Sequence, residues 1–290
     1  MEKTEGRQAT KARDRPRPGA NGTPTGAPSH VPTSHDQAER PETPSPTREV
    51  DLDDRLDPSF VSRITPLFKL LRLYSRLEVE GIERVPDGPV ILAANHTGWT
   101  GLDYAYTALA MKDARGRFVR GLAHKTWFRR PQIGDLAARL GLFEVGKDTM
   151  RTLLERGEAI LIFPEGERGA FKGQNERYLL QDFARGYIRV ALETGAPIVP
   201  VAIVGGEEAN PSSARIDSYE ELLDLSLPMP VNFFPRPAKW RISFLEPIEL
   251  GKDPKATADS ERVHRENDRV RAAIQYELQR LLSVRGHPFL

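Results

Sequence analysis

The stretch ILAANHTGWTGLDY, from Ile91 to Tyr104, decides the fold. An apolar run typical of a buried strand stops at Asn95 and His96, two glycines follow, and Asp103 stands at the start of a helical pattern. A strand that turns tightly into a helix is the repeating unit of α/β proteins. A histidine and a carboxylate on the two sides of such a turn can pair, and the pairing orients the imidazole as a general base. The spacing alone does not establish a catalytic site.

Strands and helical segments alternate along the rest of the chain. Four further apolar runs have the character of strands, namely RFVRGLAH, AILIFPEG, PIVPVAIVG and WRISFLEP. Helices are expected near residues 103–112, 132–140, 148–156, 183–194 and 259–283. This alternation predicts an α/β fold with a mostly parallel central sheet flanked by helices. Ligands gather at the carboxyl ends of strands in such sheets, so chemistry is expected at NHTGWTGLD and at PEGERG.

Composition excludes several classes of protein. The 290 residues include 42 basic and 41 acidic side chains, so no global field attracts nucleic acid and no nucleic-acid partner is expected. The absence of cysteine excludes disulfides, thiolate metal sites and cysteine nucleophiles. No apolar run approaches the ~20 residues that span a bilayer, and no apolar core follows the basic N-terminal residues. We therefore expect a cytoplasmic chain that is neither exported nor membrane-spanning.

The first 57 residues differ in composition from the remainder. Eight of the 24 prolines precede Arg48, among many Gly, Ser, Thr and charged residues. Such a segment cannot bury enough apolar surface to offset its backbone entropy. We predict a disordered tail over residues 1–57 and one folded domain over residues 58–290.

An amphipathic helical segment is predicted at the start of that domain, over residues 58–77. Pro58 suits a first helical position, and Pro66 marks a kink or a restart. Apolar residues recur at helical spacing, and there are four cations, with no acidic residue between Pro58 and Arg76: Phe60, Ile64, Leu67, Phe68, Leu71 and Tyr74, with Arg63, Lys69, Arg72 and Arg76. The segment either packs on the core or lies on an anionic membrane surface. A second apolar patch, LPMPVNFFPRPAKW, is a candidate for the same membrane interface or for the roof of an acyl tunnel.

A second polar motif follows the strand AILIF. Pro164, Glu165 and Gly166 end the strand, and Arg168 and Lys172 come close behind. A carboxylate and two cations on one loop suit the binding of a polar, anionic acceptor, and a solvated turn is the alternative. His124 also ends a strand, so a metal site could be drawn from four side chains: His96, Asp103, His124 and Glu165. No two of these stand four residues apart on one helix, and we predict no metal.

Taken together, these motifs resemble the glycerolipid acyltransferases, the family of lysophosphatidate acyltransferases. The resemblance runs from about Arg76 to Pro247 in four ordered blocks: NHTGWTGLD, HKTWFRRPQIGDLAARLGLFEVGKD, FPEGER and APIVPVAIVG. It implies a glycerol-3-phosphate acyltransferase-like fold. Six residues separate His96 from Asp103 where the common form has four, a spacing similar to the branch of diacylglycerol acyltransferases. Glu167 and Gly169 stand where the family usually has Thr and Ser.

The resemblance also implies roles for particular residues. His96 would deprotonate a hydroxyl, and Asp103 would orient it, as in a serine hydrolase without the serine. Glu165, Gly166 and Arg168 would bind the glycerol part of the acceptor. Lys125 would bind its phosphate, and Pro200 would lie on the acyl-binding side.

We therefore expect an acyltransferase without a cofactor. It would move a fatty acyl group from a coenzyme A or acyl carrier protein thioester to a glycerolipid hydroxyl at the cytoplasmic face of the membrane. The first choice of acceptor is 1-acyl-glycerol-3-phosphate, and mono- or diacylglycerol or another lyso-lipid is the alternative. A non-catalytic lipid-binding protein is the second alternative, although such a protein has no need for the His96–Asp103 pair.

Overall fold

The computed structural model describes residues 52, 54–98, 100–170, 172–211, 232 and 234–289 of the chain. Within them, seven strands form one sheet in the order β1-β7-β6-β2-β5-β3-β4. The strands are β1 (Glu78–Glu80), β2 (Val90–Ala94), β3 (Val119–Ala123), β4 (Leu142–Glu144), β5 (Ala159–Ile162), β6 (Ile198–Val204) and β7 (Arg241–Phe244). Neighbours run parallel except β6 and β7, which are antiparallel. The predicted α/β class with a mostly parallel sheet is confirmed.

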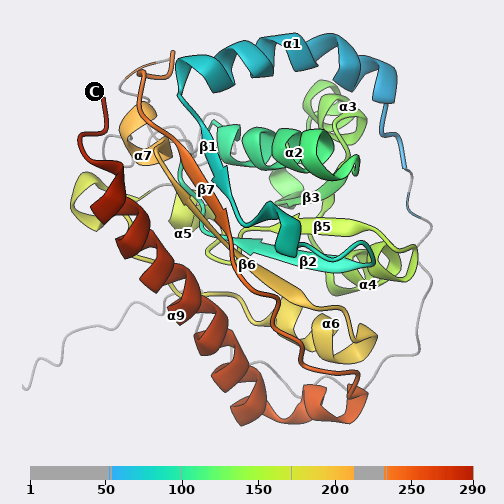
Figure 1. Ribbon diagram of the computed structural model, residues 1–290. Helices are drawn as coiled ribbons and strands as arrows, with labels where there is room; N and C mark the ends of the chain where they lie inside the picture. The colour runs from blue at the N-terminus through green and yellow to red at the C-terminus, as the bar shows by residue number, and fades with distance from the viewer. Residues whose placement is uncertain are drawn as a thin grey trace, which may run out of the picture. The chain divides into compact units, whose positions relative to one another are not determined.

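Helices cover both faces of this sheet (Figure 1). Those described are α1 (Pro58–Tyr74), α2 (Leu102–Arg115), α3 (Pro131–Arg139), α4 (Lys147–Glu155), α5 (Glu167–Ala170), α6 (Gly186–Thr194), α7 (Gly206–Ala209) and α9 (Ser260–Arg285). Four short 3-10 turns join them, at Ile82–Arg84, Lys125–Phe128, Gln174–Glu176 and Pro254–Ala258. Helices α4, α6 and α9 pack on one face, and α2 packs on the other with α1 beside it.

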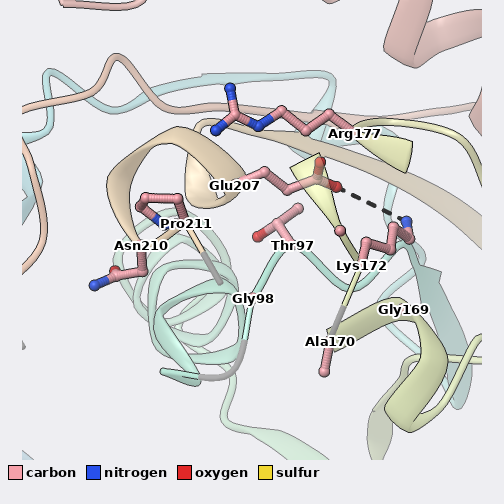
Figure 2. A pocket seen from close by; sticks show the side chains of 10 residues that line it. Thr97, Gly98, Gly169, Ala170, Lys172, Arg177, Glu207, Asn210 and Pro211 are labelled. Carbon is pink, nitrogen blue, oxygen red and sulfur yellow. Dashed lines mark ion pairs between the residues drawn. The ribbon is translucent and has the colours of Figure 1, made fainter. Parts of the chain in front are cut away.

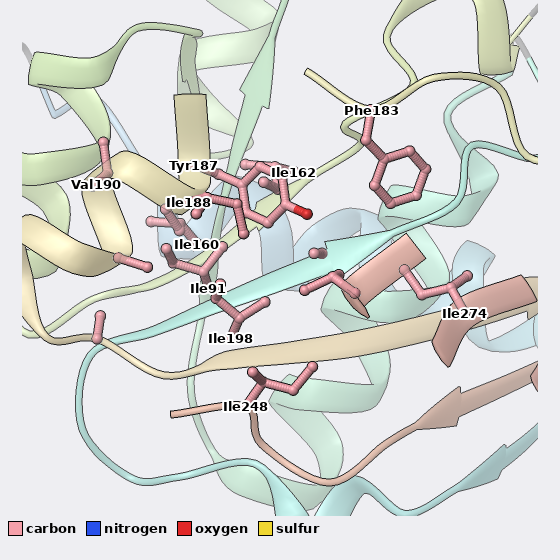
Figure 3. Packing of buried hydrophobic residues seen from close by; sticks show 14 of the residues in the cluster. Ile91, Ile160, Ile162, Phe183, Tyr187, Ile188, Val190, Ile198, Ile248 and Ile274 are labelled. Carbon is pink, nitrogen blue, oxygen red and sulfur yellow. The ribbon is translucent and has the colours of Figure 1, made fainter. Parts of the chain in front are cut away.

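The core consists of two apolar layers, one on each face of the sheet. All residues of β2, β5 and β6 are buried, as expected of parallel strands that are covered on both sides. One layer joins these strands to α4, α6 and α9 through side chains such as Ile91, Ile188 and Ile274 (Figure 3). The other layer contains Tyr106 of α2 and Trp240, whose rings meet edge to face with their centroids 4.9 Å apart. Trp240 is only 1% exposed and is therefore a core residue, so its predicted place at a membrane interface is wrong.

Helix α1 differs from the prediction at Pro66. The helix runs without a break from Pro58, at its first position, to Tyr74. Pro66 lacks the N–H that would bind the carbonyl of Ser62, but both residues are exposed, so water can serve that carbonyl. Phe68 and Leu71 are partly buried against the layer below, which explains why the helix lies on the domain.

The predicted disordered tail ends too late. The Asp54 carboxylate accepts hydrogen bonds of 3.1 and 2.9 Å from Arg120, and Asp57 caps α1 and binds Arg139 at 3.0 Å. These acidic residues therefore join the domain through ion pairs, which an argument from apolar content cannot detect. Residues 1–51, Met229 and Phe233 lie outside the described part of the chain. Among the helices that are described, none is both long enough and apolar enough to cross a bilayer.

Candidate active site

The predicted chemical motifs meet at the carboxyl ends of neighbouring strands. His96 follows β2, Glu165 follows β5, and Glu207 lies in α7 directly after β6. Strand β2 lies between β5 and β6, and β3 lies beside β5, which brings Lys125 to the same edge. The expectation that the strand-end motifs gather at one edge of the sheet is confirmed.

The imidazole of His96 is bound to Asp103. Nδ1 lies 2.6 Å from Oδ2 of Asp103, a carboxylate that is only 1% exposed in the first turn of α2. The same Oδ2 accepts the amide of Thr97 at 3.0 Å, and Oδ1 accepts the amide of Tyr104 at 2.8 Å. An ionised carboxylate can only accept, so Nδ1 donates to it, and in a neutral imidazole the lone pair then lies on Nε2. This arrangement can remove a proton from a bound hydroxyl.

Other contacts hold the His96 ring and its loop in place. Phe163 stacks on the imidazole with ring centroids 4.3 Å apart. The Asn95 amide group donates to the carbonyl of Ile203 at 2.9 Å and accepts the amide of the same residue at 2.7 Å. The loop is thereby tied to β6 through a fully buried side chain. The sequence marks Asn95 only as the end of a strand, because its role in fixing the loop depends on Ile203, which lies 108 residues away.

The loop also packs closely against Gly206. A Cβ atom at this position would lie 2.3 Å from Oγ1 of Thr97 and 2.6 Å from its carbonyl oxygen. Only glycine permits that approach of the two backbones.

Glu165 is buried and turned towards the protein interior. Its side chain is 0% exposed, and its oxygens accept the His96 amide at 3.1 Å and the Gln181 amide at 2.8 Å. Nζ of Lys172 lies 2.8 Å from Oε2. Direct binding of an acceptor, as the resemblance implies, would require this fully buried carboxylate to become accessible. The geometry makes this carboxylate a support of the His96 loop.

Lys172 also differs from the expectation. Its side chain is 2% exposed and forms ion pairs with Glu165 and, at 3.8 Å, with Oε1 of Glu207. It is therefore not an exposed cation on a flexible loop. Burial raises the pKa of the Glu207 carboxyl to about 7, and the charge of Lys172 opposes that rise.

The other predicted residues have varied surroundings. Gly166 is in a turn with φ 59°, and Arg168 and Lys125 are exposed. Within the described residues, neither cation forms a hydrogen bond or an ion pair. Pro200 is buried inside β6, in register with Ala93 of β2, and its carbonyl accepts the amide of Leu245 at 2.9 Å.

The second histidine of the motifs has a separate partner. Nδ1 of His124 lies 3.4 Å from Oε1 of Glu167, and both side chains are about half exposed. In the part of the chain that the structure describes, no three His, Asp or Glu side chains come together as metal ligands would. His96, Asp103, His124 and Glu165 are therefore not brought together as a metal site.

A polar pocket lies beside the His96 loop (Figure 2). Its lining comes from the ends of β2, β5 and β6: Thr97, Gly98, Gly169, Ala170, Lys172, Gly173, Arg177, Glu207, Asn210 and Pro211. Glu207 and Arg177 were missed in the sequence. The signal for Glu207 was present, because GGEEAN directly follows a buried strand, as the two recognised motifs do. No comparable signal marks Arg177.

Comparison with known proteins finds a matching family and several relatives. The family model described as Acyltransferase matches residues 76–204. An uncharacterized protein of Mycobacterium tuberculosis is 37% identical over 249 residues, which cover 80% of this chain and 70% of that protein. A protein of Gallus gallus named as a DGAT1/2-independent enzyme synthesizing storage lipids is 25% identical over 189 residues, covering 65% of this chain and 56% of that protein.

The fold is also similar to that of a solved structure. The crystal structure of the 1-acyl-sn-glycerophosphate acyltransferase from Thermotoga maritima superposes with a TM-score of 0.50. The match covers 80% of this chain and 86% of that one, at 17% sequence identity. At this identity the likeness shows a shared fold.

Proposed function

Since this chain belongs to the acyltransferase family, we propose that it is a glycerolipid acyltransferase, which moves a fatty acyl group from an acyl thioester to the free hydroxyl of 1-acyl-glycerol-3-phosphate. The observation that carries the proposal is the contact of 2.6 Å between His96 and the buried Asp103, which leaves Nε2 available to a hydroxyl. The pair supplies the base and its orienting group, which acyl transfer to an alcohol requires.

In the proposed reaction, Nε2 of His96 takes the proton of the acceptor hydroxyl while the hydroxyl oxygen attacks the thioester carbonyl carbon. Asp103 stabilises the imidazolium that forms. Collapse of the tetrahedral intermediate breaks the carbon–sulfur bond, and the imidazolium gives its proton to the departing thiolate. The amides of Thr97 and Tyr104 are already bound to Asp103, so we assign oxyanion binding to backbone amides near Gly98.

The substrates follow from the same proposal. The donor is a thioester of coenzyme A or of an acyl carrier protein, and no further cofactor takes part. Arg168 and Lys125 are exposed at the same edge of the sheet as His96 and suit an anionic headgroup. Gly166 allows the turn between β5 and Arg168, and Pro200 is assigned to the acyl side by the resemblance.

A neutral acceptor is the second candidate. The relative from Gallus gallus is named for storage lipid synthesis, and Glu167 occupies a position where the resemblance has a neutral residue. The side chain of Glu167 pairs with His124 next to Arg168, so it reduces the positive charge there. A mono- or diacylglycerol would need no such charge.

Access to lipid substrates is proposed to occur at the cytoplasmic face of the membrane. Three leucines of α1, Leu67, Leu70 and Leu73, are 57%, 63% and 74% exposed, and Phe234 is 66% exposed. The ring of Tyr74 lies 5.6 Å from that of Phe234. These five residues form an apolar ridge along the outer side of α1. An exposed stripe of this size suits insertion between lipid headgroups.

The cations of α1 contribute less to the binding of an anionic membrane surface than the sequence suggests. Lys69 and Arg72 lie 3.6 and 3.3 Å from the carboxylate of Asp113 in α2. Arg63 and Arg76 contact main-chain oxygens only among the described residues. A cation near an anionic surface contributes about 1 kcal/mol, and the pairing with Asp113 reduces this for two of the four. We therefore propose that the ridge provides most of the membrane affinity.

The function is tested by incubating the purified chain with labelled acyl-coenzyme A or acyl carrier protein and a panel of acceptors. The panel contains 1-acyl-glycerol-3-phosphate, other lysophospholipids, monoacylglycerol and diacylglycerol. The proposal expects an esterified product with the phosphorylated acceptor. Product with neutral acylglycerols alone would establish the second candidate. No product with any pair of substrates would contradict the proposed activity.

The catalytic pair is tested by substitution. We expect His96→Ala to lower kcat by at least ~10³-fold and Asp103→Asn by ~10²-fold, because the base is required and its partner orients it. The matched control is His264→Ala, which removes another histidine near a carboxylate, 3.3 Å from Asp268 on the exposed face of α9. Transfer by His96→Ala at the rate of the control would contradict the mechanism.

A further inference from the structure

Three buried charged side chains lie directly beneath the His96 loop. Nζ of Lys172 is 2.8 Å from Oε2 of Glu165 and 3.8 Å from Oε1 of Glu207. The exposed fractions of these side chains are 2%, 0% and 7%. Figure 2 shows the amino group of Lys172 pointing towards the carboxylate of Glu207. We call these three residues the ionic node.

The ionic node connects segments that are distant in the sequence. The carboxylate of Glu165 accepts the amides of His96 at 3.1 Å and Gln181 at 2.8 Å. The carboxylate of Glu207 accepts the amide of Tyr178 at 2.9 Å. The end of β2, the end of β5, the loop after α5 and the start of α7 are therefore joined through two carboxylates and one lysine.

Such a node is expensive to bury unless every charge is compensated. A buried carboxylate that loses its cation takes up a proton or draws in water, and either change removes acceptor capacity. For Glu165, that capacity is the bond to the main chain of His96. The position of the catalytic base therefore depends on a lysine that does not touch it.

We infer that Lys172 is a positioning residue, which compensates the buried charge of Glu165 and thereby holds the main chain of His96 so that the imidazole faces both Asp103 and the substrate. The inference concerns the loop geometry, and its kinetic consequence rests on the proposed acyl transfer. It assigns to Lys172 a task inside the protein in place of contact with an acceptor.

The test compares Lys172→Met with Arg120→Met. Arg120 is also buried and also bridges two carboxylates, Asp54 at 2.9 Å and Glu158 at 2.8 Å, but it lies in β3 on the other side of β5 from β2. We expect both variants to unfold at lower urea concentration. Only Lys172→Met should speed hydrogen exchange at the His96 amide, measured by NMR, and lower kcat by ~10- to 100-fold with little change in KM.

A double variant keeps the test decisive if Lys172→Met does not fold. Glu165→Gln combined with Lys172→Met removes both charges and leaves no stranded carboxylate at position 165. A glutamine offers one acceptor oxygen where the carboxylate served the amides of both His96 and Gln181. We therefore expect the double variant to fold and still to show faster exchange at His96 and a reduced kcat. Exchange at His96 as slow as in the parent, in whichever of the two variants folds, would overturn the inference. Because exchange needs no substrate, a chain inactive towards every acceptor would contradict the proposed function without deciding the role of Lys172.

Discussion

The Glu207 carboxyl should make the stability of this protein depend on pH, and Glu207→Gln should remove that dependence. The side chain is 7% exposed, and burial raises its pKa from 4.5 to about 7 despite the nearby charge of Lys172. Between these two pH values the folded protein holds a proton that the unfolded chain has released. The free energy of unfolding therefore decreases as the pH rises through this window.

The size of the effect follows from the two pKa values. A difference from 4.5 to about 7, at 1.36 kcal/mol for each pH unit, corresponds to about 3 kcal/mol. Glutamine has nearly the same shape, carries no charge at any pH and can still accept the amide of Tyr178 through its side-chain oxygen. The variant should therefore gain stability relative to the parent as the pH increases, with most of the gain complete near pH 8.

Urea unfolding of both proteins at intervals from pH 4.5 to 8.5 measures this difference. Glu155→Gln, which removes an exposed carboxylate from the end of α4, is the control for the loss of one negative charge. If the unfolding free energies of the parent and Glu207→Gln stay a constant distance apart over the whole range, the argument from burial is refuted.

Two further predictions concern the loop and the membrane. Gly206→Ala should lower stability by about 1–3 kcal/mol and reduce kcat, because its Cβ would lie 2.3 Å from Oγ1 of Thr97. Gly186→Ala, at the first position of α6 with only Cγ of Lys147 in ordinary contact at 4.0 Å, should instead stabilise by up to about 0.5–1 kcal/mol. A Gly206→Ala protein as stable as the parent in urea would contradict the close packing seen there. Replacing Leu70 and Leu73 by Ser should weaken flotation with anionic vesicles at low and at high salt while the fold is kept, and unchanged flotation would place the membrane contact elsewhere.

The predicted and observed strands agree where the residues of a segment form a long apolar run by themselves. The apolar runs at β2, β5 and β6 are strands because such residues are buried on both faces of a parallel sheet. The three-residue strands β1 and β4, with the sequences EVE and LFE, were missed because each is too short to show a period and exists only through pairing with β7 and β3.

The segment of α1 shows why an apolar stripe could not decide between two environments. Phe68 and Leu71 pack on the layer below, while Leu70 and Leu73 are exposed on the other side of the same helix. Helical spacing predicts that apolar residues share a face, but it does not say what covers that face. The pairing of two cations with Asp113 was likewise invisible, because that carboxylate belongs to α2.

By itself, the sequence determined the fold class, the meeting of the strand-end motifs at one edge of the sheet and the types of side chain brought there. These follow from local periodicity and from the rule that parallel strands present their carboxyl ends together. Only the tertiary structure decided that Glu165 faces inward, that Lys172 is buried beside it and that Glu207 completes the ionic node. The direction of a side chain at the end of a strand depends on the amides and charges that distant segments place around it. Burial then decides whether the charged group is free to bind a substrate or instead supports the loop from inside.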